Sequence, residues 1–301
     1  MVGGEALVDL VSDGTDSLTA HPGGGPFNTA RTIARLEQPV AYLGRISTDR
    51  FGARLRDELA ADGVSLDAVV ETDDPTTLAL VEIDPAGGAS YRFYIDGTSV
   101  PGLTTAELPS APSMLHVGSL GLVFEPTAAT LEALAAARSD SALVTIDVNC
   151  RPLAIDDPVA YRARIERMLA HCHLLKASDD DLAYLEPDHS AVDAARALLE
   201  RGPSVALLTR GAAGSIVVTS DDEISVPAVQ VEVVDTIGAG DAFGGAFLAW
   251  WRRRGLGIDD LGQVDAVLEA TRFASLVAAK TCVRAGAVPP RLAEVGPTPY
   301  H

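Results

Sequence analysis

Residues 235–247 read Asp235-Thr236-Ile237-Gly238-Ala239-Gly240-Asp241-Ala242-Phe243-Gly244-Gly245-Ala246-Phe247. The apolar run 229–234 before them predicts a strand, and the run 242–251 at their end predicts a helix. A glycine-rich turn therefore opens a helix, where the first N–H groups lack helical partners and the dipole is positive. Because glycines let a phosphate approach the backbone closely, the turn indicates an anion site with Asp241 beside it.

Outside this turn, short β-rich runs alternate with helical patterns. Apolar residues recur at helical spacing in 127–138, 191–201 and 264–280. The predicted strands are rich in Val, Leu and Ile, as expected of a parallel sheet that is covered on both faces. They are 2–9, 41–46, 114–119, 142–148, 173–177, 204–210 and 214–220. The alternation predicts an α/β fold in which helices flank a doubly wound, mostly parallel sheet, within one domain over residues 1–301.

Two segments, roughly 10–20 and 76–100, interrupt this alternation. The second contains two β-rich runs joined by Pro85-Ala86-Gly87-Gly88, a hairpin turn signal. The first is short, rich in turn residues and alternates polar with apolar residues. Together they predict a small antiparallel sheet beside the main body. It is either an edge decoration or a lid that excludes water from a reaction site.

Composition excludes several classes of protein. The 301 residues are 47% hydrophobic and 22% charged, which is ordinary for a globular protein. No apolar run reaches the roughly 18 residues that span a bilayer. Residues 1–10 lack the basic start of a secretory signal, so we expect a cytoplasmic location. The net charge of −19 repels nucleic acid and anionic membranes, so neither is an expected partner.

The glycine turn differs from three common phosphate-binding motifs. A dinucleotide fingerprint requires glycine where Phe243 stands. Neither Lys176 nor Lys280 follows a glycine, so there is no P-loop, and the H-R-D signature of protein kinases is absent. Asp241 is then either an aspartate that stabilises the start of a helix or a base beside a bound phosphoryl group.

The turn resembles the C-terminal signature of the PfkB (ribokinase-like) carbohydrate kinases, D-T-x-G-A-G-D, across residues 235–241. Their N-terminal signature, G-G-x-x-x-N-x-A, is matched by Gly23-Gly24-Gly25-Pro26-Phe27-Asn28-Thr29-Ala30. Residues 43–52 are similar to the family's G-x-x-G-x-D-x-F-G run, although Ile46-Ser47 stand where its second glycine region falls. Two signatures in the right order are specific, and the resemblance covers essentially the whole chain.

The resemblance implies roles for individual residues around a sugar. Asp241 would be the catalytic base, and the backbone of Gly238, Ala239 and Gly240 would hold the transferring phosphoryl group. The pattern D-x-N-x-R at 147–151 resembles the fructokinase-like branch of the family. The residues that would line the sugar pocket are Asp9, Gly24, Gly25, Asn28, Asn149, Arg151 and, on the lid, Arg92.

The resemblance also implies a nucleotide site with metal ions. Residues 209–214 resemble the family's T-x-G-x-x-G loop, and Ser178 and Asp181 stand where much of the family has N-x-x-E. The implied ATP contacts are Ser178, Thr209, Gly211, Gly214 and Ser275. Asp181 would hold Mg²⁺ indirectly, and Asp235 with the Ile237 carbonyl would hold a monovalent cation, K⁺. Because aspartate is one methylene shorter than glutamate, the reach of Asp181 is in question.

These observations predict an ATP-dependent sugar kinase, with fructose as the leading acceptor. Alternatives within the class are 2-keto-3-deoxygluconate, ribose or a nucleoside. A non-catalytic sugar- or nucleotide-binding protein on the same fold is the alternative outside it, and the intact Asp241 turn argues against that reading. Relatives often pair through the lid, and an exposed sheet edge can accept a second copy, so we expect a homodimer.

Overall fold

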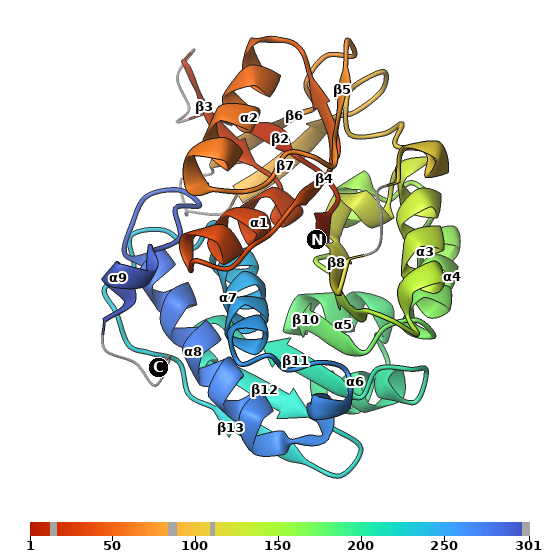
Figure 1. The fold of residues 1–301 in the computed structure, drawn as a ribbon, viewed down its shortest axis with the longest axis vertical. Coiled ribbons are helices and arrows are strands. Elements are labelled where there is room, and N and C mark those ends of the chain that lie inside the picture. Colours follow the sequence, from red (N-terminus) through yellow and green to blue (C-terminus); the bar gives the residue numbers. More distant parts are fainter. Residues whose placement is uncertain (13–16, 84–88, 109–111, 297–301) are drawn as a thin grey trace.

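A long sheet organises the computed structural model, which describes residues 1–12, 17–83, 89–108 and 112–296. Within these residues it has nine strands (Figure 1). In spatial order they are β13 (Glu223–Val226), β12 (Ser215–Val218), β11 (Val205–Thr209), β10 (Leu174–Ser178), β9 (Leu143–Asp147), β8 (Met114–Gly118), β1 (Val2–Gly3), β4 (Tyr42–Ser47) and β5 (Val69–Thr72). Every pairing from β11 to β5 is parallel, and the two pairings at the other end are antiparallel.

Helices cover both faces of this sheet. One apolar cluster joins strand residues such as Val144 and Ile146 to α3, α4, α5 and α6, and a second joins Leu143 and Leu207 to α7 and α8. The helices are α1 (Gly25–Arg35), α2 (Arg50–Asp62), α3 (Thr127–Arg138), α4 (Pro158–Leu169), α5 (Asp179–Leu185), α6 (Ala191–Leu199), α7 (Ala239–Arg253), α8 (Val264–Cys282) and α9 (Leu292–Val295). Successive residues of β9 thus face opposite helical layers, which confirms the predicted doubly wound architecture.

A separate four-stranded sheet forms where the small second sheet was predicted, and we call it the lid sheet, or lid, below. Its order is β3 (Leu18–Gly23), β2 (Leu7–Ser12), β6 (Leu78–Ile83) and β7 (Ala89–Tyr94). The outer pairs are antiparallel, as predicted, and the central pair β2 and β6 is parallel. The predicted hairpin turn at 85–88 lies outside the described residues. Figure 1 places this sheet at one end of the molecule, above α1 and α7.

The first predicted strand, 2–9, is wrong in one respect, because it is two strands in different sheets. β1 ends at Gly3, and Gly4 adopts a φ of 147°, where a Cβ would lie 2.4 Å from Pro26 Cγ. The chain then passes through Glu5 into β2 of the lid. A turn that only glycine fits therefore transfers the chain from body to lid.

The strand predicted at 229–234 is also wrong. β13 ends at Val226, and residues 227–234 form no strand. Val229, Val233 and Val234 are 39%, 57% and 62% exposed, and the first two line a cavity. An apolar run that lines a cavity can have the composition of a strand, although it pairs with no neighbouring strand.

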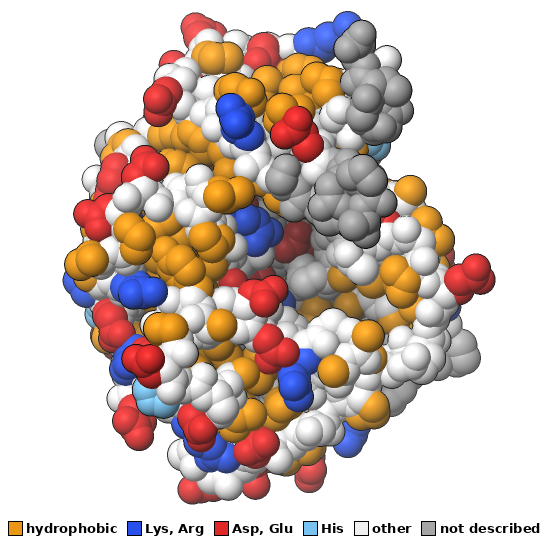
Figure 2. All heavy atoms as spheres, turned by 180° about the vertical axis from the view of Figure 1, so that it is seen from behind, with side chains coloured by type: hydrophobic (Ala, Val, Ile, Leu, Met, Phe, Trp, Pro, Cys, Tyr) orange, Lys and Arg blue, Asp and Glu red, His pale blue; other side chains and the backbone are white. Residues whose placement is uncertain are grey.

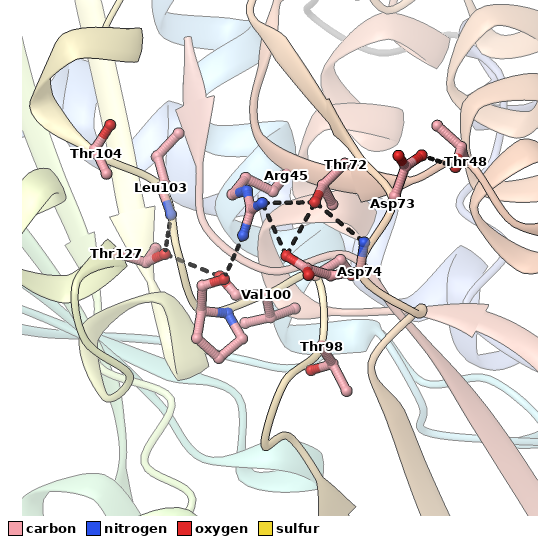
Figure 3. Close-up of polar contacts among 12 residues, drawn as sticks. Arg45, Thr48, Thr72, Asp73, Asp74, Thr98, Val100, Leu103, Thr104 and Thr127 are labelled. Carbon is pink, nitrogen blue, oxygen red and sulfur yellow. Dashed lines mark hydrogen bonds and ion pairs between the residues drawn. The ribbon is translucent and has the colours of Figure 1, made fainter.

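Arg45 fastens the base of the lid (Figure 3). Its guanidinium donates to the Pro101 carbonyl (2.9 Å) and to Thr72 Oγ1 (2.6 Å), and it forms an ion pair with Asp74 (2.9 Å). Asp74 precedes β6 and Pro101 follows β7, so one side chain on β4 holds both connections of the β6–β7 pair to the body. A Cβ on Gly102 would lie 2.0 Å from Arg45 Nη1, so the close approach requires glycine.

Among the described residues, no helix combines the length and the apolarity that crossing a bilayer requires.

Candidate functional site

The glycine turn lies at the N-terminus of α7, as predicted. Gly238 precedes the helix with a φ of 75°, and a Cβ there would lie 2.6 Å from Ala287 Cβ. The N–H of Ala239 donates to the Thr236 carbonyl at 3.2 Å and so closes the turn. Asp241 lies in the first turn of α7 and is 9% exposed. The side chain is therefore buried next to a helix N-terminus, where an anion is stabilised.

A cavity of about 280 Å³ opens beside Asp241, between the lid and the body. Figure 2 shows a hollow between the part that carries the lid sheet and the rest, in which acidic and basic side chains lie together. The cavity is lined by Glu5, Leu7, Asp9, Gly24, Gly25, Asn28, Tyr91, Phe93, Ser119, Leu120, Asn149, Arg151, Thr236, Ile237, Gly238, Gly240 and Asp241. Residues from the lid, α1, the ends of β8 and β9, and α7 thus converge on one space.

Asn28 on α1 is the direct partner of Asp241. Its Nδ2 donates to Asp241 Oδ2 at 2.9 Å, and Thr29 Oγ1 donates to the Asp241 carbonyl at 3.3 Å. Asn28 Oδ1 is buried and has no hydrogen-bond partner among the described residues. A buried acceptor without a hydrogen bond costs folding free energy, so this oxygen is suited to accept a hydrogen bond from a hydroxyl of a bound molecule.

Burial raises the pKa of Asp241 from 3.8 to about 6, against the hydrogen bond from Asn28, which lowers the pKa. Asp147 also raises the pKa of Asp241, and Lys176 and Arg151 lower it. A carboxyl with a pKa near neutral is matched to proton transfer near neutral pH. The same site can thus hold a hydroxyl and take its proton.

Asp9 and Arg151 form the charged part of the opposite wall. Burial raises the pKa of Asp9 to about 6, while Arg151 lowers it and Asp241 raises it. Arg151 Nη1 donates to Asn149 Oδ1 at 2.7 Å and to the Asn149 carbonyl at 3.3 Å. These bonds hold Asn149 at a φ of 39°, a conformation that costs on the order of 1–3 kcal/mol in a non-glycine residue. The wall is therefore fixed before any ligand arrives.

A second cavity, of about 590 Å³, lies on the other side of the turn. Of the residues predicted to bind nucleotide, it is lined by Ser178, Thr209, Gly211, Gly214 and Ser275. Apolar residues that sequence reasoning did not assign complete it, among them Val229, Val231, Val233, Phe243 and Ala279. An apolar cleft with a few polar groups suits a planar base. Thr236 and Gly240 line both cavities, so the two spaces meet at the glycine turn.

Arg92 lies apart from the other predicted sugar contacts. It is exposed, whereas its strand neighbours Tyr91 and Phe93 line the smaller cavity. Successive residues of a strand point to opposite faces of the sheet, so Arg92 faces away from the cavity that Tyr91 and Phe93 line. The ring centroids of Tyr91 and Phe93 are 6.1 Å apart and stacked, which gives the lid face of the cavity an aromatic surface.

Asp181 is largely occupied by the protein itself. Its Oδ1 accepts from the Cys150 N–H (2.6 Å), and its Oδ2 accepts from the N–H and the hydroxyl of Ser178 (2.7 and 2.8 Å). A carboxylate offers about four acceptor sites, so about one remains for a metal-bound water. Asp180, its neighbour, lines the larger cavity. Among the described side chains, no three His, Cys, Asp or Glu residues cluster in a way that could hold a metal ion.

Asp235 ties the glycine turn to the end of α8. Its Oδ1 accepts from the Ile237 N–H at 3.0 Å and its Oδ2 from the Gly286 N–H at 2.8 Å. The Val234 and Asp235 N–H groups both donate to the Cys282 carbonyl. Asp235 thus lies where two loops meet, and Ile237 lines the smaller cavity.

Two charged groups of the site were missed by the sequence reasoning. Glu5 lines the smaller cavity at 2% exposure, and burial raises its pKa to about 7. Lys176, 5% exposed, pairs with Asp147 at 2.6 Å, and a Cβ on Gly240 would lie 3.4 Å from its Nζ. A signal for both existed, because each is a lone charge in or beside an otherwise apolar strand.

Comparisons with known proteins agree with this geometry. The chain is 37% identical to a fructokinase of Rhizobium leguminosarum bv. trifolii over 82% of this chain and 77% of that one. A fructokinase from Xylella fastidiosa with bound ATP superposes with a TM-score of 0.91 at 27% identity, covering 98% of this chain and 95% of the other. A Vibrio cholerae fructokinase variant with fructose, ADP and potassium gives 0.86 at 27%, covering 98% and 96%. The sequence pattern of the pfkB family carbohydrate kinases matches residues 2–293, and the chain belongs to that family.

Proposed function

We propose that this carbohydrate kinase transfers the γ-phosphoryl group of ATP to a hydroxyl of fructose. The observation that carries the proposal is the meeting of the two cavities at the α7 turn, with Asp241 on the side of the smaller one. Nucleotide in the larger cavity and sugar in the smaller one would point their reacting groups at the same helix N-terminus. The ATP bound in one similar fructokinase structure, and the fructose and ADP bound in another, support a nucleotide and a sugar as the two ligands.

The mechanism is an in-line transfer assisted by residues already in place. Asp241 takes the proton of the attacking hydroxyl, and the buried Asn28 holds that carboxylate by a 2.9 Å hydrogen bond. The backbone at Gly238, Ala239 and Gly240 and the positive end of α7 stabilise the charge on the phosphoryl group. Arg151 adds a positive charge at the edge of the cavity.

Metal ions complete the proposal. Mg²⁺ neutralises the nucleotide phosphates in such transfers. Asp181 would reach it only through a water, using the acceptor capacity that its three hydrogen bonds leave. A monovalent cation, K⁺ in the Vibrio relative, is assigned to the junction of Asp235 and the Ile237 carbonyl. A cytoplasmic location and a homodimer through the lid are also proposed, the latter because β3 and β7 are the two edges of the lid sheet.

The charges around the sugar cavity favour a neutral acceptor. Three carboxylates, Glu5, Asp9 and Asp241, line it, against the single guanidinium of Arg151 among the described lining residues. An acidic sugar such as 2-keto-3-deoxygluconate, or a sugar phosphate, would bring another negative charge into this space. Electrostatic repulsion would then raise the cost of binding.

A panel of acceptors tests the proposal. ADP release is measured with Mg-ATP and potassium for fructose, ribose, a nucleoside and 2-keto-3-deoxygluconate, each with wild type and Asp241→Asn. We expect the highest kcat/KM with fructose and at least tenfold less with the acidic sugar. A faster reaction with ribose or a nucleoside would overturn the choice of fructose. Binding of sugar without any turnover above the Asp241→Asn background would favour the non-catalytic alternative.

The pH dependence follows from the two raised pKa values. Asp241 must be ionised to accept a proton, and Asp9 must be ionised for both of its oxygens to act as hydrogen-bond acceptors only. Because each has a pKa of about 6, and Glu5 in the same cavity has a pKa of about 7, kcat/KM should be flat above about pH 8 and fall on acidification. Well below pH 6 the fall should approach about 100-fold per pH unit, because two groups titrate together. A profile that stays flat down to pH 5 would contradict both assignments.

A further inference from the structure

Glu5 has no role in the proposed transfer, yet it is among the most completely hydrogen-bonded carboxylates of the site. It lies between β1 and β2, where the chain passes from the body to the lid, and is 2% exposed. Its Oε1 accepts from the Gly25 N–H at 2.9 Å, and its Oε2 accepts from the Gly121 N–H at 3.0 Å. The Ser119 side chain also hydrogen-bonds to it. Three donors thus converge on one buried side chain.

The three donors belong to two different walls of the sugar-side cavity. Gly25 is the first residue of α1, and its N–H is one of the helix groups without a partner inside the helix. Ser119 and Gly121 belong to a 3₁₀ turn, residues Ser119–Leu122, that follows β8. Ser119 has a φ of 55°, which a non-glycine residue keeps only where its surroundings hold it. Glu5 therefore joins α1 to a strained turn far away in the sequence.

The α1 wall leads directly to the reacting groups. A Cβ on Gly25 would lie 3.3 Å from Asp241 Oδ1 and 3.0 Å from Asn149 Nδ2, so this backbone is packed against both side chains. One turn further along α1, Asn28 donates to Asp241. A shift of the first turn of α1 would therefore move the groups that contact substrate. Misplacement of reacting groups by about 1 Å can lower a rate by about 100-fold.

The carboxylate satisfies two backbone N–H groups, at a cost that a neutral acceptor would avoid. Burial of an ionisable group costs folding free energy unless hydrogen bonds compensate for it. Burial raises the pKa of Glu5 to about 7, although the hydrogen bonds from its partners lower it. The molecule keeps an acid that is expensive to bury at a point that touches both walls.

We propose that Glu5 is a positioning residue that holds the first turn of α1 and residues 119–121 in the geometry that receives the sugar. This inference rests on the proposed function only in taking the cavity of Asp9 and Asp241 as the sugar site. Glu5 acts through Gly25, Ser119 and Gly121, and so influences the binding of the sugar rather than the nucleotide.

The first test is Glu5→Gln. The side chain keeps its volume. In wild type both carboxylate oxygens accept from backbone N–H groups, so in the variant the amide NH₂ must face one of these donors. We expect the KM for sugar to rise at least tenfold, with the KM for ATP within threefold of wild type. The sugar is the one that wild type phosphorylates fastest in the acceptor panel.

Glu107→Gln is the matched control. Glu107 also holds a 3₁₀ turn, accepting from the Thr104 N–H at 2.8 Å, but it is exposed and does not line the cavity. It should leave both KM values unchanged. If Glu5→Gln does not fold, Ser119→Ala removes one donor and keeps the carboxylate, and should raise the sugar KM about threefold to tenfold.

A folded Glu5→Gln or Ser119→Ala variant with the sugar KM of wild type would overturn the inference. Equal rises in the KM for sugar and for ATP would do the same, because they indicate a general loss of structure. Failure of the proposed function shows instead in the wild type, as an absence of sugar phosphorylation. The two failures are therefore distinguishable.

Discussion

Replacement of Asp241 by asparagine is expected to lower kcat by about 10²–10⁴-fold, while sugar still binds with a dissociation constant within about threefold of wild type. Asparagine has nearly the same volume and its carbonyl can accept the hydrogen bond from Asn28, but it cannot take a proton. Steady-state kinetics give kcat, and calorimetry gives the sugar affinity. A loss of only a few-fold would remove Asp241 from the role of base.

Asp193→Asn provides the control for this substitution. Asp193 lies in the first turn of α6, where it accepts from Ser190 Oγ at 2.6 Å, away from both cavities. This variant measures the effect on kcat of losing a first-turn aspartate that only stabilises a helix. We expect wild-type kcat from Asp193→Asn, so that the loss in Asp241→Asn can be assigned to chemistry.

The Asp241→Asn variant should be no less stable than wild type at pH 7.5. The pKa of Asp241 is raised from 3.8 to about 6, so its ionised form is less favourable in the folded chain than in the unfolded one. Its contribution to stability is full below about pH 4 and is lost as pH rises through 6, a difference on the order of 3 kcal/mol at most. A lower melting temperature for Asp241→Asn would indicate that the carboxylate serves the fold.

Asp9→Asn has the second largest expected effect, a fall of about 10–100-fold in kcat/KM for the sugar. The carboxylate lies on β2 of the lid and lines the sugar-side cavity. Hydrogen bonds to a charged acceptor contribute about 1.5–3 kcal/mol, and the asparagine NH₂ cannot accept from a hydroxyl. The fall should appear mostly in the KM for sugar, because the proposed role of Asp9 is to hold the substrate and not to take a proton.

The KM for ATP is the internal control for Asp9→Asn. Asp9 does not line the larger cavity, so this constant should stay within about threefold of wild type. If the sugar KM is unchanged, Asp9 does not contact the acceptor. If both KM values rise together, the substitution has disturbed the seating of the lid rather than a sugar contact.

Local patterns sufficed for most of the fold. The apolar runs 142–148, 173–177 and 204–210 became β9, β10 and β11 within two residues at each end, because strands buried on both faces have an unmistakable composition. The run 229–234 has the same composition but forms no strand, because Val229, Val231 and Val233 line the larger cavity. The division of residues 2–9 into two strands depends on the positive φ of Gly4, which the periodicity of apolar residues does not reveal.

The site was less accessible to local reasoning. Asp9, Asn28 and Asp241 share no local pattern, and only the family resemblance placed them together before the structure did. Arg92 shows what a resemblance leaves open, because a lid strand has two partly exposed faces and periodicity alone does not say which one meets the sugar. Glu5 and Lys176 depend on contacts with residues far along the chain, such as Gly121 and Gly240.

The wall shared by the two cavities has a consequence for inhibitor design. Thr236 and Gly240 line both spaces, so the two spaces adjoin at the turn. A single bisubstrate compound, with a nucleoside and a sugar ring joined through phosphates, would fill both spaces at once. Tethering gives the second half an effective concentration in the millimolar range or above, so such a compound should bind far more tightly than either half alone.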